Sequence, residues 1–164
     1  MKYFRYILLT LPLLLAACGY GFGEQGQSVL SEQDRTLAIA EVKNPTTISW
    51  LEPRIRRILR DELTRRGIVK WVDSKSQADA LITINIEKFY RPTTVSGEKD
   101  QTLQSSANFV FSAEIKSATD GSIIWNSGSI SQSWPFFSGQ EAEADKEVTL
   151  LGIRRLADRM SQNY

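Results

Sequence analysis

The sequence predicts an α+β fold, a two-layer sandwich in which two helices pack on one face of a mixed, mostly antiparallel sheet of four to five strands. Three observations support this prediction. Five segments have the composition of strands, and several of them alternate between apolar and polar residues. Two further segments place apolar residues at helical spacing. The resulting order is β-α-β-β-β-β-α, and two helices can cover one face of a single sheet while the other face stays polar.

The predicted domain opens with a strand and a helix. The segment 36–42 alternates and is followed by turn residues. The helix should begin between Ser49 and Pro53, because Ser49 and Glu52 have capping-box spacing and proline is tolerated in a first turn. Gly67 should end it. Its apolar stripe consists of Leu51, Ile55, Ile58, Leu59 and Leu63.

The middle of the chain predicts four further strands. Residues 68–72 form a short one, and residues 80–90 and 103–116 form two long ones with clear alternation. Asp120-Gly121 is typical of a hairpin turn into the serine-rich segment 123–133.

A second helix is predicted for residues 141–160. Its acidic residues lie early and its arginines late, as the helix dipole favours. The expected buried stripe consists of Leu150, Ile153, Ala157 and Met160.

The N-terminus has the pattern of a secretory signal peptide. Lys2 and Arg5 precede an apolar run that is too short to span a bilayer. The run ends in Leu15-Ala16-Ala17-Cys18, which matches the bacterial lipobox, so we expect cleavage after residue 17 and lipidation of Cys18. By resemblance to bacterial sorting signals, Gly19 after this cysteine favours the outer membrane.

Cleavage would leave residues 18–164, enough for one domain with one core. Residues 18–34 are rich in Gly, Gln and Ser and are expected to form a flexible tether, followed by a single domain over residues 35–164. Cys18 is the only cysteine, so no disulfide can form within the chain. The mature chain would carry 18 basic and 19 acidic residues, which gives no bulk attraction to nucleic acid.

The composition argues against an enzyme. Histidine is absent, which removes the usual general base, the Ser-His and Cys-His pairs and the commonest metal ligand. No Walker or dinucleotide-binding spacing follows a strand. A Ser-Lys dyad stays open, since serine and lysine are common and their spacing carries no signal. We expect no catalytic residues, no metal site and no cofactor.

The first helix is rich in arginine, and two interpretations remain open. It contains six arginines, no lysine and three acidic residues. One interpretation is a solvated face supported by pairs such as Glu62 with Arg66. The other is an anionic partner, because guanidinium groups suit phosphate and carboxylate recognition.

The assembled features resemble the LptE family of lipopolysaccharide-assembly lipoproteins. The resemblance rests on Cys18-Gly19-Tyr20-Gly21-Phe22, on the helix ending at 58–68, and on the order of strands. It implies a protein that sits inside the LptD β-barrel of the outer membrane, plugs it, assists its assembly and contacts lipopolysaccharide. The loop 92–102 departs from the family pattern, because Lys99 is balanced by acidic neighbours.

Two alternatives have a similar opening: lipoproteins that regulate cell-wall synthases, and lipoproteins that form secretion channels. A generic membrane-tethered scaffold is a further alternative. A plug should offer a polar sheet face to a polar lumen. The serines at alternating positions of the last strand suit that role. They are Ser127, Ser129, Ser131 and Ser133.

A lipopolysaccharide-binding edge is predicted from topology. The connection 73–79 is too short for a parallel crossover, so the strands on either side of it should be antiparallel neighbours. That arrangement would gather cations and aromatic side chains at one end of the sheet, where they would either bind a phosphorylated glycolipid or simply cap the helix and the core. The candidate contacts are Arg65, Arg66, Arg91, Lys99, Trp134, Phe136 and Phe137.

Overall fold

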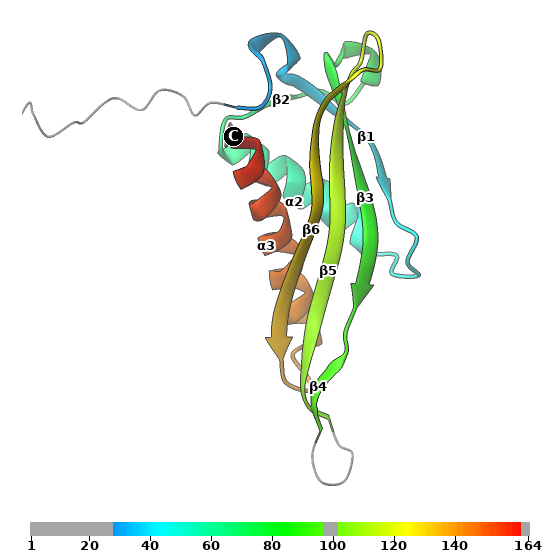
Figure 1. Ribbon diagram of the computed structural model, residues 1–164, viewed down its shortest axis with the longest axis vertical. Helices are drawn as coiled ribbons and strands as arrows, with labels where there is room; N and C mark the ends of the chain where they lie inside the picture. Colours follow the sequence, from blue (N-terminus) through cyan, green and yellow to red (C-terminus); the bar gives the residue numbers. More distant parts are fainter. Residues whose placement is uncertain (1–27, 97–101, 162–164) are drawn as a thin grey trace, which may run out of the picture.

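The computed structural model describes residues 28–96 and 102–161 of the 164-residue chain (Figure 1). The predicted signal peptide, the lipobox cysteine Cys18 and Lys99 lie outside these ranges. The described elements are η1 (Glu32–Asp34), β1 (Thr36–Lys43), α2 (Leu51–Arg65), β2 (Lys70–Trp71), η2 (Lys75–Gln77), β3 (Ala80–Tyr90), β4 (Thr93–Ser96), β5 (Thr102–Ser117), β6 (Ile123–Phe136) and α3 (Glu141–Ser161). The predicted α+β class is confirmed.

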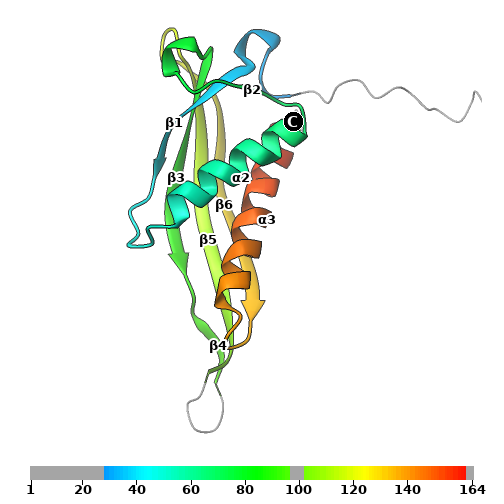
Figure 2. The same cartoon turned by 180° about the vertical axis from the view of Figure 1, so that it is seen from behind.

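All six strands form one mixed sheet. β1 pairs in parallel with β2 on one side and with β3 on the other. β3 and then β4 pair with the same edge of β5 in antiparallel fashion, and β6 pairs with its other edge. β4 lies within the segment 92–102 that was expected to be a loop. Figures 1 and 2 show α2 and α3 on one side of the curled sheet.

The predicted antiparallel pairing across residues 73–79 is wrong. β2 and β3 run in the same direction on opposite sides of β1. The short connection suffices because β2 has only two residues: Trp71 and Ala80 both lie level with Leu37, at the start of β1. The chain therefore only has to pass over the end of β1, a separation of roughly two strand spacings or 10 Å.

α2 begins and ends for local reasons. Its N-cap is Trp50, without a side-chain cap, so the predicted capping box of Ser49 and Glu52 does not form. At its other end Gly67 adopts a positive φ of 66°, and the Ile68 amide donates to the Leu63 carbonyl at 3.2 Å. This Schellman-type ending stops the helix where the sequence predicted.

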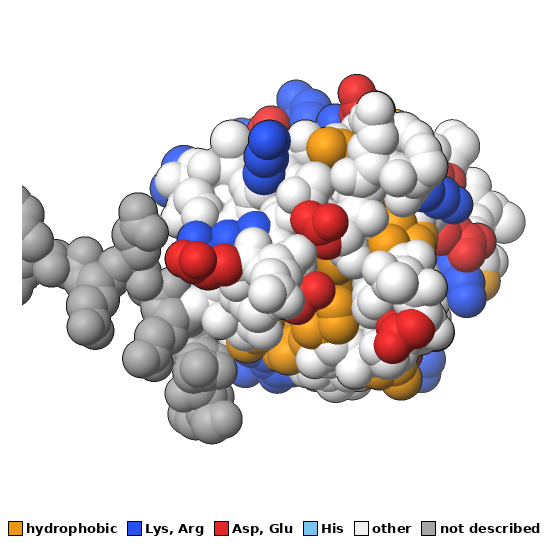
Figure 3. Space-filling model, turned by 90° about the horizontal axis from the view of Figure 1, so that it is seen from above, with side chains coloured by type: hydrophobic (Ala, Val, Ile, Leu, Met, Phe, Trp, Pro, Cys, Tyr) orange, Lys and Arg blue, Asp and Glu red, His pale blue; other side chains and the backbone are white. Residues whose placement is uncertain are grey.

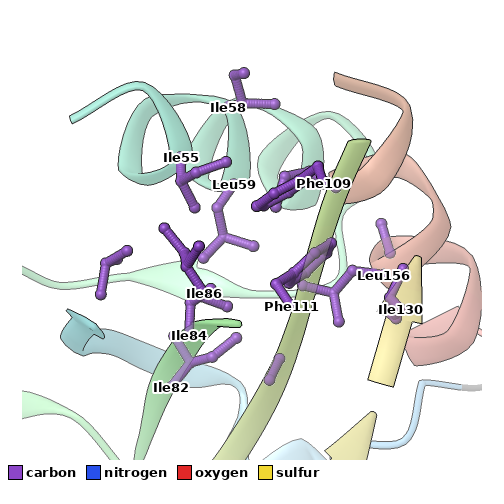
Figure 4. Packing of buried hydrophobic residues seen from close by; sticks show 14 of the residues in the cluster. Ile55, Ile58, Leu59, Ile82, Ile84, Ile86, Phe109, Phe111, Ile130 and Leu156 are labelled. Atoms are coloured by element: carbon purple, nitrogen blue, oxygen red, sulfur yellow. The ribbon is translucent and has the colours of Figure 1, made fainter. Parts of the chain in front are cut away.

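The core lies between the helices and the sheet (Figure 4). The predicted stripe of α2 is fully buried, and its Ile55 and Leu59 pack toward the isoleucines of β3 and the stacked rings of Phe109 and Phe111. α3 covers β5 and β6. Its buried residues differ partly from prediction, because Leu150 is only half-buried. The buried side of α3 consists of Ala144, Asp145, Val148, Thr149, Gly152, Ile153, Leu156, Ala157 and Met160.

The packed part of the chain begins before the predicted boundary at Arg35. Leu30 is buried in the core, and the Val29 amide donates to the Met160 carbonyl at 2.9 Å. Val29 and Leu30 therefore pack at the end of the molecule where α3 finishes, although they lie within the predicted tether. The Gly-, Gln- and Ser-rich composition of this segment gave no indication that Leu30 is buried.

Candidate functional site

The face of the sheet that points away from the helices is polar. The pairing registers place Asn85, Ser112 and Ser129 side by side across β3, β5 and β6. Ser106 and Ser133 lie diagonally across β5 and β6, with 2.9 Å between their hydroxyl oxygens. No other described element covers this face (Figures 1 and 2). It offers hydroxyl and amide groups for hydrogen bonding over the length of three strands.

Ser127 does not belong to this polar face. It is buried, its hydroxyl accepts from the Ala113 amide at 2.8 Å, and it donates to the Gly128 carbonyl at 2.6 Å. The register between β5 and β6 shifts at this point, and Gly128 has a positive φ of 62°. The serine therefore fills a β-bulge, whereas Ser129, Ser131 and Ser133 are exposed as predicted.

The outer edge of β6 is partly covered by α3. Arg159 donates to the carbonyls of Ser127 and Ser129, and Arg155 donates to the carbonyl of Ser131 at 3.4 Å. Edge carbonyls that are occupied in this way are less available to pair with another strand. From sequence, these arginines were interpreted only as complements to the helix dipole, since a contact with a strand edge has no local pattern.

One end of the molecule, the distal end, holds Arg91 and the aromatic residues that follow β6. Arg91 donates through Nε to Asp145 Oδ1 at 2.8 Å and through Nη2 to Asp145 Oδ2. This hydrogen bonding raises the pKa of Arg91, against the effect of partial burial. Arg91 also lines a cavity of about 290 Å³ with Phe136 and Glu141. The cation predicted to meet a lipid phosphate is thus already bound to a buried carboxylate.

The predicted aromatic contacts do lie at this distal end. Phe136 pairs with Ser105 at the end of β6 and is buried, whereas Trp134 and Phe137 are exposed. Tyr90, at the end of β3, is exposed as well and was not among the predicted residues. Alternation within β3 would place Tyr90 on the inward side with Ile84 and Ile86. The register shift between Ile86 and Lys88 reverses this phase, so Tyr90 lies outward.

Arg65 and Arg66 lie at the opposite end, so the single predicted edge does not form. Arg66 donates to Asp158 at 2.6 Å and to Glu62 at 2.8 Å, and Arg65 donates to Glu62 at 2.6 Å. Asp158 and Asp145 are 13 residues apart on α3, which separates Arg66 from Arg91 by about 20 Å along the helix. Figure 3 looks onto the end of the molecule toward which α2 and α3 run, and shows charges of both signs interspersed with hydrophobic atoms.

Glu62 is the most buried acidic group of this opposite cluster, with 4% of its side chain exposed. Burial alone would raise its pKa. The hydrogen bonds and charges of Arg65 and Arg66 outweigh burial and hold the pKa of Glu62 below its ordinary value. The cluster thus fixes α2 to α3 and leaves little free charge.

A groove between α2 and α3 was not predicted. The two helices converge at their C-terminal ends and diverge toward their N-terminal ends (Figure 2). The space between them has a volume of about 360 Å³. It is lined by Arg54, Arg57, Ile58, Asp61, Glu62, Arg65, Lys146, Leu150 and Arg154. In the sequence, only the arginine-rich helix pointed to this groove. The residues that α3 contributes could not be predicted, because the packing of the two helices was not known.

The described residues contain no cluster of three or more acidic, cysteine or histidine residues that could hold a metal ion. Within the same ranges, no helix is long and apolar enough to cross a membrane.

Comparison with known proteins gives a family and a fold. A family model described as LptE, lipopolysaccharide-assembly, matches residues 35–163. No curated protein matches the sequence. Among solved structures, uncharacterized lipoprotein B from Nitrosomonas europaea superimposes with a TM-score of 0.63 and 14% identity, over 86% of this chain and 90% of that one. The PelC dodecamer from Paraburkholderia phytofirmans gives a TM-score of 0.57 and 14% identity, over 83% and 93% of the respective chains. At these identities the likeness establishes a shared fold.

Proposed function

This chain belongs to the LptE, lipopolysaccharide-assembly, family, and we propose that it is a non-enzymatic outer-membrane lipoprotein that binds inside an LptD-type β-barrel. There it plugs the barrel, assists its assembly and helps to deliver lipopolysaccharide to the outer leaflet. Cys18 is the proposed lipidation site, and the partners are the barrel, the lipid and the membrane that holds the anchor.

The uncovered polar face of the sheet is the observation that supports this proposal. A protein that sits in a water-filled lumen needs hydrogen-bonding groups without a large apolar patch. The exposed serines of β6 and the half-buried polar groups of β5 meet that requirement. The opposite face cannot serve, because the helices cover it.

The place at which the described part of the chain starts also supports the proposed function. The described chain starts at Ser28, next to the end of α3, while Phe136 and Arg91 lie at the distal end. An anchor at Cys18 would therefore hold one end of the domain near the membrane. The distal end would then extend along the barrel axis.

Within this proposal, Trp134 and Phe137 contact lipopolysaccharide at the distal end, together with Phe136 and Arg91. Lys99 lies outside the described residues and stays a proposed contact from the sequence alone. Arg65 and Arg66 would not take part in the same contact, because they lie at the opposite end and bind Glu62 and Asp158.

Affinity purification of the full chain from detergent-solubilised membranes tests the barrel partnership. The wild-type chain should recover one β-barrel protein at one-to-one stoichiometry. The double substitution Ser131→Arg and Ser133→Arg puts two large charged groups on the open face and should abolish recovery. Thr64→Arg, an exposed position on α2, is the control and should recover the barrel as the wild type does.

Two results would contradict the proposal. Repeated recovery of a peptidoglycan synthase without a barrel would favour the cell-wall role. A ring of identical copies, comparable to the dodecamer that PelC forms, would favour a channel component.

A further inference from the structure

We propose that the groove between α2 and α3 is a second anion-binding site, which takes the phosphate-bearing headgroup of an anionic glycolipid. The inference rests on the proposed role in lipopolysaccharide delivery. It adds a site on the helical layer, away from both the polar sheet face and the distal end.

The charge of the groove is strongly one-sided. Five cationic and two acidic side chains line it, and one of the two acids, Glu62, already binds Arg65 and Arg66. Three of the cations form no ion pair within the described residues: Arg54, Arg57 and Arg154. Elsewhere on α2, by contrast, Arg56 binds Glu52 and Arg60 binds Asp73. Two of the unpaired arginines, Arg54 and Arg57, thus line the groove from α2, and Arg154 lines it from α3.

Arg54 supplies an independent observation. Its guanidinium carbon lies 4.3 Å from the centre of the Trp50 ring, which holds the side chain in place. Its Nη1 atom is buried and has no hydrogen-bond partner among the described residues. Buried donors are rarely left unpaired in proteins, so Arg54 keeps hydrogen-bonding capacity that no described residue uses.

The shape of the groove favours a headgroup over an acidic protein segment. Its volume of about 360 Å³ falls in the range of small-ligand sites, roughly 300–1,000 Å³. A stable protein interface needs a much broader surface, about 800 Å² on each partner. The lining includes Ile58 and Leu150, which can contact the apolar part of an amphiphile. Phosphate offers several acceptor oxygens at one point, which suits converging guanidinium groups.

Binding of a defined lipid tests the site. The full chain, purified in a neutral detergent and immobilised, is titrated with fluorescent diphosphorylated lipid A and with the same lipid after removal of its phosphates. Arg54→Gln with Arg57→Gln should raise the Kd for the phosphorylated lipid roughly tenfold, and Arg154→Gln on the opposite wall should raise it about threefold. The dephosphorylated lipid should bind weakly to all variants.

The matched control is Arg56→Gln with Arg60→Gln, which removes two charges from the same helix outside the groove. It should change the Kd less than about twofold. Equal losses in both pairs, or none in either, would overturn the groove site while leaving the proposed function intact. If the wild-type chain bound no lipid A, the proposed role in lipid delivery would fail as well. If a glutamate-rich peptide bound to the groove and lipid A did not, the occupant would be a protein partner, and the glycolipid proposal would be overturned.

Discussion

Gly152 of α3 lies directly against the ring of Phe109 in β5. A Cβ atom at this position would stand 2.9 Å from Phe109 Cδ1 and 3.1 Å from Phe111 Cε1. Both rings are fully buried and stack on each other with 4.4 Å between their centroids. The glycine thus sets the distance at which the helix approaches the sheet.

Gly152→Ala should therefore destabilise the protein. Alanine improves helix propensity by about 1 kcal/mol, but a methyl group forced against two packed rings costs about 1–3 kcal/mol. We expect a net decrease in the free energy of unfolding, measured by urea denaturation. In a Phe109→Leu background the closest ring contact is removed and the contact with Phe111 stays, so the same substitution should cost less than in the wild type. Equal effects of Gly152→Ala in both backgrounds would contradict the packing argument.

The sequence predicted the long elements well because each has its own periodicity. The bounds of β3, Ala80–Tyr90, and the stripe of α2 follow from side-chain alternation and from helical spacing, which local sequence records. Gly152 had no such signal. Its role depends on two phenylalanines in another strand, and a glycine within a helical pattern predicts only a cost in helix propensity.

The candidate site could be predicted only in part. The hairpin at Asp120-Gly121 correctly brought Phe136 to the end of β3, near Arg91. The orientation of β2 was wrong, because a two-residue strand can be parallel to its neighbours without a long crossover. Because β2 and β3 both run parallel to β1, Arg66 lies at the end of the molecule where β3 starts, and Arg91 lies at the other end. The partner of Arg91, Asp145, is more than 50 residues away and carries no sequence signal.

Breaking the pair of Arg91 and Asp145 should destabilise the distal end. Arg91→Gln leaves the buried Asp145 carboxylate without its partner. We expect a loss of about 1–3 kcal/mol in the free energy of unfolding, less than for a fully buried pair because Arg91 is 36% exposed.

Lys146→Gln is the control for Arg91→Gln, because Lys146 binds Glu143 and Glu147 in an exposed arrangement on the same helix. It should leave the urea midpoint nearly unchanged. If both substitutions shifted the midpoint equally, the effect of Arg91→Gln would come from the loss of a positive charge in general. The specific pair with Asp145 would then not be its cause.

Stability should fall in acid through Glu62. Its pKa is lower in the folded protein than the ordinary value of 4.5. Its contribution is therefore fully present above about pH 4.5 and is lost as the pH falls through the folded pKa. Glu62→Gln should cost about 1–3 kcal/mol at neutral pH and should weaken the pH dependence of unfolding below pH 4.5.

Asp61→Asn is a close control for Glu62, since Asp61 is the preceding residue, is exposed and forms no ion pair within the described ranges. Urea denaturation of the three proteins over the acidic range separates the two carboxylates. A Glu62→Gln variant with the same pH dependence as the wild type would show that the buried cluster does not contribute to acid lability.

The last prediction concerns the anchor. Cys18→Ala should give an unprocessed or mislocalised protein, because the acyl chains are the only strong membrane-binding element expected in the mature chain. The measurement is fractionation of membranes after a high-salt wash, with metabolic labelling by palmitate to detect the lipid. Ser28→Ala, at the start of the described chain, is the control and should be labelled and fractionate as the wild type does. Normal maturation of Cys18→Ala, together with salt-resistant recovery in the outer membrane, would show that the domain reaches the membrane through its protein partner and not through a lipid.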